Sequence, residues 1–252
     1  MLDDNAAENI PGRAGSRRGS SVGACGALAL LAVASVAAAT PMDLILGFSS
    51  LPSAQGWTYT PSGAHAGAPE SNVFWDADGA LVQNTLGLSN GVSGGSIFYV
   101  RSGGVTANET KRIVVRARCL AVQGSTNATD GQGGFIYGFT TGSVQYAFGL
   151  TDTRLTVLQP SGTVLVPGTF DNTAFHEYIF QWAPPGSYQL YRDGVQVFSG
   201  SGGFTFSASR VYFGDGTGGA NARGETSYFR FSQDLATPVQ ATSWGRLKQL
   251  YR

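Results

Sequence analysis

The chain has 252 residues, enough for one full-sized sandwich or barrel domain with short appendages. Charged residues make up 13% of it and 36 residues are glycine, a mixture that argues against coiled coils and helical bundles and favours an all-β protein with many turns. Sixteen basic residues balance sixteen acidic ones, so no net charge attracts nucleic acid or anionic lipid. We therefore expect no nucleic-acid partner.

Residues 1–39 have the three parts of a secretory signal peptide. Three arginines before residue 19 precede an apolar run from Val22 to Ala39, and the small residues Ala37 and Ala39 fit cleavage before Thr40. An uncleaved anchor helix is the alternative, because the run is about as long as the shortest membrane spans. The signal interpretation predicts an extracellular or cell-surface protein, of bacterial type, with no membrane span after cleavage.

Alternation of apolar and polar residues with a period of two recurs along the rest of the chain and indicates strands. Asp193-Gly194 favours a two-residue type I′ hairpin turn, and Pro160-Ser161-Gly162 favours a second hairpin. So many short strands predict a two-sheet antiparallel sandwich over residues 40–235. In chain order, strands are expected at 43–48, 80–85, 97–100, 112–122, 135–139, 144–150, 155–158, 163–166, 176–182, 188–192, 195–198, 210–213 and 226–231.

Cys119 is the one thiol that remains after the signal is removed, so no internal disulfide can form. It alternates with Arg116 and Arg118 in a strand-like segment, which predicts a small core residue. A nucleophilic role would need a nearby base, and both histidines, His65 and His176, are distant in the sequence.

Four closing segments occur in a characteristic order. The pair Phe175-His176 opens a strand, the Asp193-Gly194 hairpin follows, Phe213-Gly214-Asp215 comes next, and Tyr228-Phe229-Arg230-Phe231 ends the series. This order resembles the concanavalin A-like lectin/glucanase superfamily, in its laminin-G-like branch. The resemblance implies an all-β, two-sheet antiparallel jelly-roll sandwich and a function that involves carbohydrate, and it supports architecture better than activity.

The hydrolases of that superfamily carry E-x-D-x-x-E on one strand, and this sequence has no such triplet. Asp76 and Asp78 form the closest carboxylate pair, but Gly79 follows them and indicates a turn. We therefore favour a non-catalytic carbohydrate-binding or surface-adhesion module. A glycoside hydrolase with another carboxylate pair, using Glu177 or Glu225, is one alternative, and a structural envelope protein is a second.

The glycine-rich loop 214–221 is the first candidate ligand site. Its side chains Asp215, Thr217 and Asn221 could accept sugar hydroxyls, and Asp215 with Asn221 could hold a calcium ion, the one cofactor that the sequence suggests. A plain connection between strands is the alternative reading of the loop.

Aromatic side chains form the second candidate site, because sugars stack on exposed rings. Trp57, Tyr137 and Tyr188 are the rings predicted to bind a glycan, although large aromatics on alternating strands usually belong to the core.

Residues 236–252 read as a linker and a short amphipathic C-terminal tail. Trp244, Leu247, Leu250 and Tyr251 would share one face of a short helix. The tail could dock on the sandwich, bind a partner or serve in sorting or surface attachment.

Overall fold

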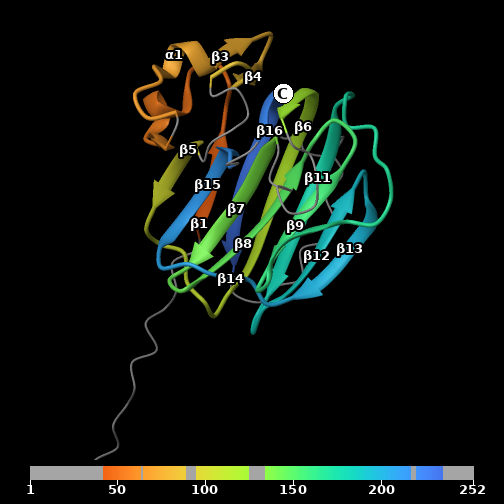
Figure 1. Cartoon of the computed structure of the whole chain (residues 1–252). Helices are drawn as coiled ribbons and strands as arrows, with labels where there is room; N and C mark the ends of the chain where they lie inside the picture. Colours follow the sequence, from red (N-terminus) through yellow and green to blue (C-terminus); the bar gives the residue numbers. More distant parts are fainter. Residues whose placement is uncertain (1–41, 64, 89–94, 125–133, 217–219, 235–252) are drawn as a thin grey trace, which may run out of the picture. The chain divides into compact units, whose positions relative to one another are not determined.

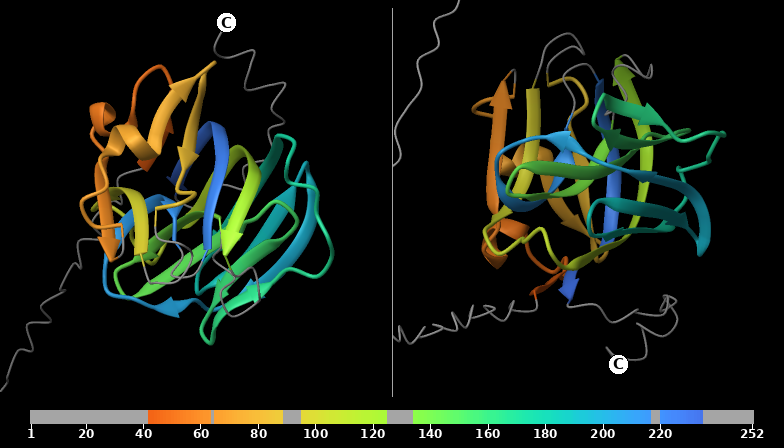
Figure 2. Two further views of the ribbon diagram at one scale, coloured as in Figure 1. Left: turned by 45° about the horizontal axis from the view of Figure 1, so that its top comes forward. Right: turned by 90° about the horizontal axis from the view of Figure 1, so that it is seen from below.

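The computed structural model describes residues 42–63, 65–88, 95–124, 134–216 and 220–234, and these residues form two antiparallel β-sheets packed face to face (Figure 1). The two layers are seen from further directions in Figure 2. The all-β sandwich predicted from the sequence is therefore confirmed. The predicted signal peptide and C-terminal tail lie outside the described residues, so the domain boundaries at 39/40 and 235/236 stay predictions.

The first sheet has eight strands, and we call it sheet A. Its order is β13-β12-β11-β6-β16-β4-β3, with β1 paired to β16 beside this path. Its strands are β1 (Met42–Leu46), β3 (Phe74–Ala77), β4 (Ala80–Asn84), β6 (Thr110–Gly124), β11 (His176–Ala183), β12 (Ser187–Arg192), β13 (Val195–Ser201) and β16 (Ala220–Asp234).

We call the second sheet sheet B. It runs β10-β9-β8-β7-β15-β5-β2, with β14 paired to β8. Its strands are β2 (Thr58–Gly63), β5 (Gly95–Ser102), β7 (Phe135–Thr141), β8 (Val144–Leu150), β9 (Leu155–Gln159), β10 (Gly162–Leu165), β14 (Phe204–Thr205) and β15 (Ser209–Asp215).

Helix is limited, in the part of the chain that the structure describes, to a 3₁₀ turn η1 (Pro52–Gln55) and a single-turn α1 (Glu70–Val73). None of the described helices is long and apolar enough to cross a bilayer.

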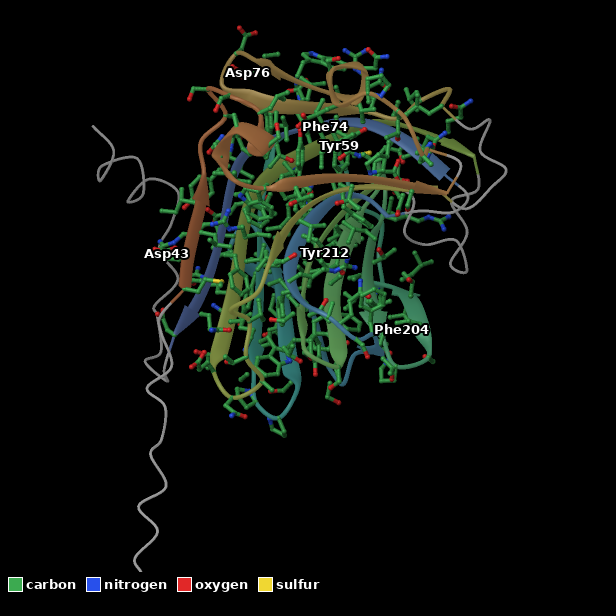
Figure 3. All side chains as sticks on the ribbon, turned by 90° about the vertical axis from the view of Figure 1, so that its left-hand side faces the viewer. Asp43, Tyr59, Phe74, Asp76, Phe204 and Tyr212 are labelled. Carbon is green, nitrogen blue, oxygen red and sulfur yellow. The ribbon has the colours of Figure 1, made fainter. Side chains whose placement is uncertain are left out.

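The core lies between the two sheets and is rich in aromatic rings. Alternation along each strand turns one side chain in two toward it, as Ile113, Val115 and Ala117 of β6 show with 0% exposure. Tyr137 of sheet B stacks on Phe229 of sheet A with 6.3 Å between ring centroids. At the top of Figure 3, Tyr59 and Phe74 close the same core with an edge-on contact at 6.1 Å. Cys119 is fully buried in the core, as predicted, and burial raises the pKa of its thiol.

Two-residue turns take the conformation that their sequences predict. Asp193 and Gly194 have φ values of 50° and 81°, both positive as a type I′ turn requires. Asp78 and Gly79, with φ values of 54° and 76°, likewise join β3 to β4. The predicted turn at Asp76–Gly79 is therefore confirmed.

Strands β6 and β16 form the centre of sheet A and are each 15 residues long, longer than the sequence pattern predicts. The reason is a break in alternation, because β16 shifts register between Arg223 and Gly224 and again between Thr226 and Tyr228. At Gly224 any side chain would meet the carbonyl of Arg118, so glycine is required at this bulge.

Candidate functional site

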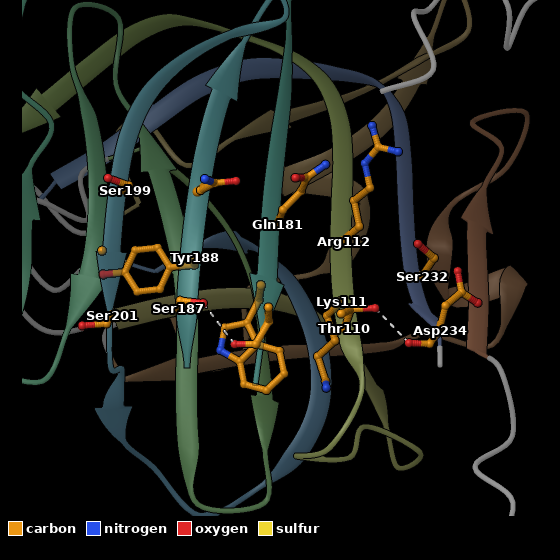
Figure 4. A pocket seen from close by; sticks show the side chains of 14 residues that line it. Thr110, Lys111, Arg112, Gln181, Ser187, Tyr188, Ser199, Ser201, Ser232 and Asp234 are labelled. Carbon is orange, nitrogen blue, oxygen red and sulfur yellow. Dashed lines mark hydrogen bonds between the residues drawn. The ribbon is translucent and has the colours of Figure 1, made fainter. Parts of the chain in front are cut away.

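A groove of about 720 Å³ crosses one end of sheet A. Its described lining comes from five neighbouring strands, β16, β6, β11, β12 and β13, as Figure 4 shows. Since Ile113 and Phe180 point into the core, their neighbours Arg112 and Gln181 point to the opposite, outer face of the sheet. The groove is therefore a feature of the outer face and not of the space between the sheets.

One row of the lining follows directly from the strand register. Arg112 on β6 pairs with Ser232 on one side and with Gln181 on the other, and Gln181 pairs with Gln189, which pairs with Ser199. This row therefore places a guanidinium, two amides and two hydroxyls in a line across five strands.

A second row lies one step nearer the strand ends. Asp234 pairs with Thr110, and Ser187 pairs with both Ala183 and Ser201. The Thr110 hydroxyl donates to the main-chain carbonyl of Asp234 at 2.9 Å, which ties β6 to the last described residue of β16. Across both rows, the lining is dominated by uncharged hydrogen-bonding groups.

Between the two rows, three residues of the lining lie beneath the floor of the groove, and their side chains turn inward to the core. Lys111, Trp182 and Tyr188 are only 2%, 3% and 2% exposed. The Lys111 ammonium lies 4.3 Å from the Trp182 ring centroid and donates to the Glu109 carbonyl at 2.7 Å. Burial lowers the pKa of Lys111 to about 8, although the nearby Glu109 acts in the opposite direction.

Arg112 is the charged side chain at the middle of the first row. It is partly buried, and its Nε and Nη2 atoms are buried without a hydrogen-bond partner among the described residues. In Figure 4 its guanidinium extends away from Thr110. Burial lowers the pKa of Arg112, while the carboxylate of Glu177 raises it and the positive charge of Arg230 lowers it.

Other charged side chains on the outer face of sheet A form ion pairs with each other. Arg118 binds Glu225 at 2.8 Å, and Arg230 binds Asp43, labelled on β1 in Figure 3, at 2.7 Å. Glu177 is further along the same face, and burial raises the pKa of its carboxyl. Its Oε2 atom is buried without a hydrogen-bond partner in the described part of the chain.

The loop side chains predicted from the sequence lie apart from the groove. Asp215 and Asn221 are 0% and 2% exposed, and neither lines the groove. The hydroxyl of Thr85 donates to the Asp215 carboxylate and accepts the Ala222 N–H at 2.9 Å, so Asp215 helps to join β15 to β16. Thr217 lies outside the described residues.

The same loop was the predicted calcium site. Within the ranges that the structure describes, no group of three or more His, Cys, Asp or Glu side chains could hold a metal ion. Calcium binding through Asp215 and Asn221 stays a prediction, since Asn221 is outside this count and residues 217–219 of the loop lie outside the described ranges.

The predicted aromatic residues separate into two environments. Trp57 and Tyr137 pack between the sheets, where Trp57 meets Phe213 edge-on at 5.3 Å and the Tyr137 hydroxyl lies 2.7 Å from Thr226 Oγ1. Because each ring lies between two sheets, neither presents a face on which a sugar could stack. Tyr188 is the one described residue of the predicted set that lines the groove, and its ring turns inward against Phe180 of the core.

The groove residues that the sequence reasoning missed are Arg112 and the row of amides and hydroxyls beside it. A signal was present, since Gln181 and Gln189 each alternate with buried residues on their own strands, and Ser199 lies exposed between two half-buried residues. Their meeting depends on the pairing of β6 with β11, which joins residues about 70 positions apart and leaves no local mark in the sequence.

Comparisons with known proteins support the fold. No family model matches the chain, and no curated protein matches it. Among solved structures, one reported for endo-acting O-glycanases of the human gut microbiota has a TM-score of 0.50 and 14% identity, over 76% of this chain and 98% of that chain. A Bacillus licheniformis β-glucanase has a TM-score of 0.45 and 12% identity, over 75% of this chain and 97% of that one.

The binding domain of Paraclostridial Mosquitocidal Protein 1 is also similar, with a TM-score of 0.40 and 14% identity over 65% of this chain. This chain covers 42% of the length of that structure. At 14% identity, the likeness with a TM-score of 0.50 supports a common fold and nothing finer. Together with the two antiparallel sheets of the structure, it confirms the predicted jelly-roll sandwich as a fold.

Proposed function

We propose that the protein is a secreted, non-catalytic carbohydrate-binding or surface-adhesion module whose glycan lies in the groove of sheet A. As part of the same proposal, the laminin-G-like segments around His176 and Asp193-Gly194 support a place in that branch of the superfamily. The signal-like residues 1–39 support export from a bacterial cell, and the C-terminal tail would serve attachment or sorting.

The chemistry of the groove lining carries this proposal. A sugar chain presents many hydroxyl groups, each of which both donates and accepts hydrogen bonds. Amides and hydroxyls do the same, and the groove supplies two glutamines and four serines besides Thr110. Its length across five strands also suits an extended chain better than a compact small molecule.

The distribution of carboxylates supports binding over hydrolysis. Asp234 is the one carboxylate among the described residues that line the groove. Glycoside hydrolysis commonly uses two carboxyl groups that flank the scissile bond, roughly 5–10 Å apart. The single carboxylate of the lining favours a module that holds a glycan without cleaving it.

A hydrolase is the second candidate, and Glu177 is the observation that favours it. Glu177 and Glu225 face outward on either side of β6, opposite Arg116 and Arg118 respectively. Burial raises the pKa of Glu177, the direction that a general acid needs. Release of reducing sugar that disappears in Glu177→Gln or Glu225→Gln would replace the binding proposal by this one.

The binding proposal is tested with the purified chain and a panel of soluble and insoluble polysaccharides, while the supernatant is assayed for released sugar. The double variant Gln181→Ala/Gln189→Ala should weaken binding about thirtyfold, because each of the two lost neutral hydrogen bonds contributes about 1 kcal/mol. Gln196→Ala is the matched control, since Gln196 is an exposed amide of β13 outside the groove, and it should bind as the wild type does.

Two results would contradict the proposal. Equal binding by the double variant and the wild type would place the glycan elsewhere on the protein. No binding across the whole panel would instead support the structural envelope protein.

A further inference from the structure

We propose that the groove selects glycans that carry negative charge, with Arg112 binding the carboxylate or sulfate group of an acidic polysaccharide. This inference rests on the proposed function, because it assigns a ligand class to the same groove. The experiment below therefore distinguishes failure of this inference from failure of the proposed function.

The position of Arg112 is the first argument. It sits in the first row between Ser232 and Gln181, which carry no charge and can contact the neutral part of a sugar. The other described cation of the lining, Lys111, is 2% exposed and directs its ammonium toward Trp182. Arg112 is only partly buried and faces outward, so it is the cation of the described lining that a ligand in the groove can approach.

The donor geometry of Arg112 is the second argument. Nε and Nη2 are neighbouring donors on one edge of the planar guanidinium, and both are buried without a partner in the described part of the chain. That edge matches the two oxygens of a carboxylate or sulfate, which accept a pair of parallel hydrogen bonds. A neutral hydroxyl would satisfy one donor and leave the other unpaired.

The charge balance of the outer face is the third argument. Glu225 and Asp43 are already held by Arg118 and Arg230 in ion pairs of 2.8 and 2.7 Å. Glu177 attracts Arg112, but it forms no ion pair with it within 4.0 Å in the described structure. Asp234 belongs to the second row, near the strand end. In Figure 4 the Arg112 guanidinium extends away from that end. Arg112 therefore keeps a positive charge that an anionic ligand can neutralise.

The test compares polymers that differ in charge and share a backbone. Polygalacturonate is paired with its fully methyl-esterified form, and dextran sulfate is paired with dextran. Binding of the full chain is measured by calorimetry at low salt and again at about 0.5 M salt, where exposed charges are strongly screened. The first pair reports a carboxylate ligand, and the second reports a sulfate ligand.

At least one anionic polymer should bind about ten- to a hundredfold more tightly than its neutral partner, the range for hydrogen bonds to a charged group. Arg112→Gln should remove that preference while leaving residual binding of the neutral polymer. Arg112→Lys should keep only part of it, since lysine retains the charge and loses the paired donors.

Arg210→Gln is the matched control. Arg210 is also partly buried, also has an unpartnered Nε, and lies on sheet B with its guanidinium 4.7 Å from the Phe206 ring centroid. It should keep the wild-type preference, and thermal unfolding should confirm that each variant is folded.

Equal binding of charged and neutral polymers by the wild type, or an Arg112→Gln variant with its preference intact, overturns this inference. In both cases the proposed function survives if Gln181→Ala/Gln189→Ala still weakens binding. Failure of both polymer pairs to bind overturns the inference as well, and the wider panel then decides the proposed function.

Discussion

Lys111 is a cation at a position of β6 whose side chain points into the core. Ile113 and Val115, two and four positions further along β6, are apolar and fully buried, and Lys111 shares their face of the sheet. Its ammonium keeps one main-chain carbonyl acceptor and two aromatic rings, those of Trp182 and Phe139, as partners. The folded state therefore holds this proton less tightly than the unfolded chain does.

This difference predicts a pH dependence of stability. The pKa of Lys111 falls from 10.5 to about 8 on folding, so below pH 8 both states carry the proton and the cost of burying the charge is constant. Between about pH 8 and 10.5 the unfolded state binds more protons, so the free energy of unfolding should rise with pH, by up to about 3 kcal/mol.

Urea unfolding of wild type and Lys111→Met across this range measures the effect. The stability of the wild type should rise relative to that of Lys111→Met as the pH increases. Arg223→Met, which removes an exposed cation that does not titrate here, should run parallel to the wild type. Parallel curves for Lys111→Met would show that Lys111 is not the titrating group.

The local sequence pattern predicts the environment of a side chain where alternation alone determines its burial. It does not do so where a contact with a distant residue determines it. Cys119 was correctly placed in the core from alternation. The glycine-rich segment after Asp215 predicts an exposed ligand-binding side chain. In the structure Asp215 is fully buried and accepts a hydrogen bond from Thr85, a residue 130 positions away. A contact of that range is invisible to a reading of local pattern.

At the scale of elements, close approach between neighbouring strands depends on particular glycines. Gly138 of β7 lies opposite Tyr212 of β15 and Ala147 of β8. A Cβ atom at this position would lie 2.7 Å from the main-chain carbonyl oxygen of Tyr146 and would meet the Tyr212 hydroxyl. Glycine at position 138 therefore lets β8 and the Tyr212 side chain approach β7 this closely on the outer face of sheet B.

Gly138→Ala should accordingly lower the free energy of unfolding by about 1–3 kcal/mol, the usual effect of overpacking. Gly47→Ala is the control, because no atom lies within 4 Å of its added Cβ and its φ is not in the left-handed region. That control should be as stable as the wild type, or slightly more so. Denaturant unfolding of both variants decides, and equal stability would show that β7 and β8 can move apart without cost.

Most strands and the Asp193-Gly194 hairpin could be predicted because they are local patterns. The lengths of β6 and β16 could not, since the bulge at Gly224 breaks the alternation that identifies a strand. The outer row that forms the groove could not be predicted either. Gln181 and Ser232 are polar residues of separate strands, and β6 has to lie between them before they share a site.

At the scale of the whole molecule, the proposed export of the protein rests on residues 1–39, which lie outside the described structure. When the chain is exported from a bacterial host, we expect mass spectrometry of the product to give residues 40–252. The reason is the small-x-small pattern of Ala37 and Ala39 before Thr40. Ala37→Leu/Ala39→Leu should abolish cleavage, and an uncut, membrane-bound wild type would support the anchor-helix alternative.

The order of the strands in sheet A also sets the time at which the protein can fold. β16 pairs with β6, β4 and β1, so Met42 meets Gln233 and the sheet's centre cannot close until residue 234 has been made. Pairings of such long range form slowly, on a scale of milliseconds to seconds. Sheet A therefore cannot be completed before residue 234 has been synthesised, so the proposed export could begin while the centre of the sheet is still open.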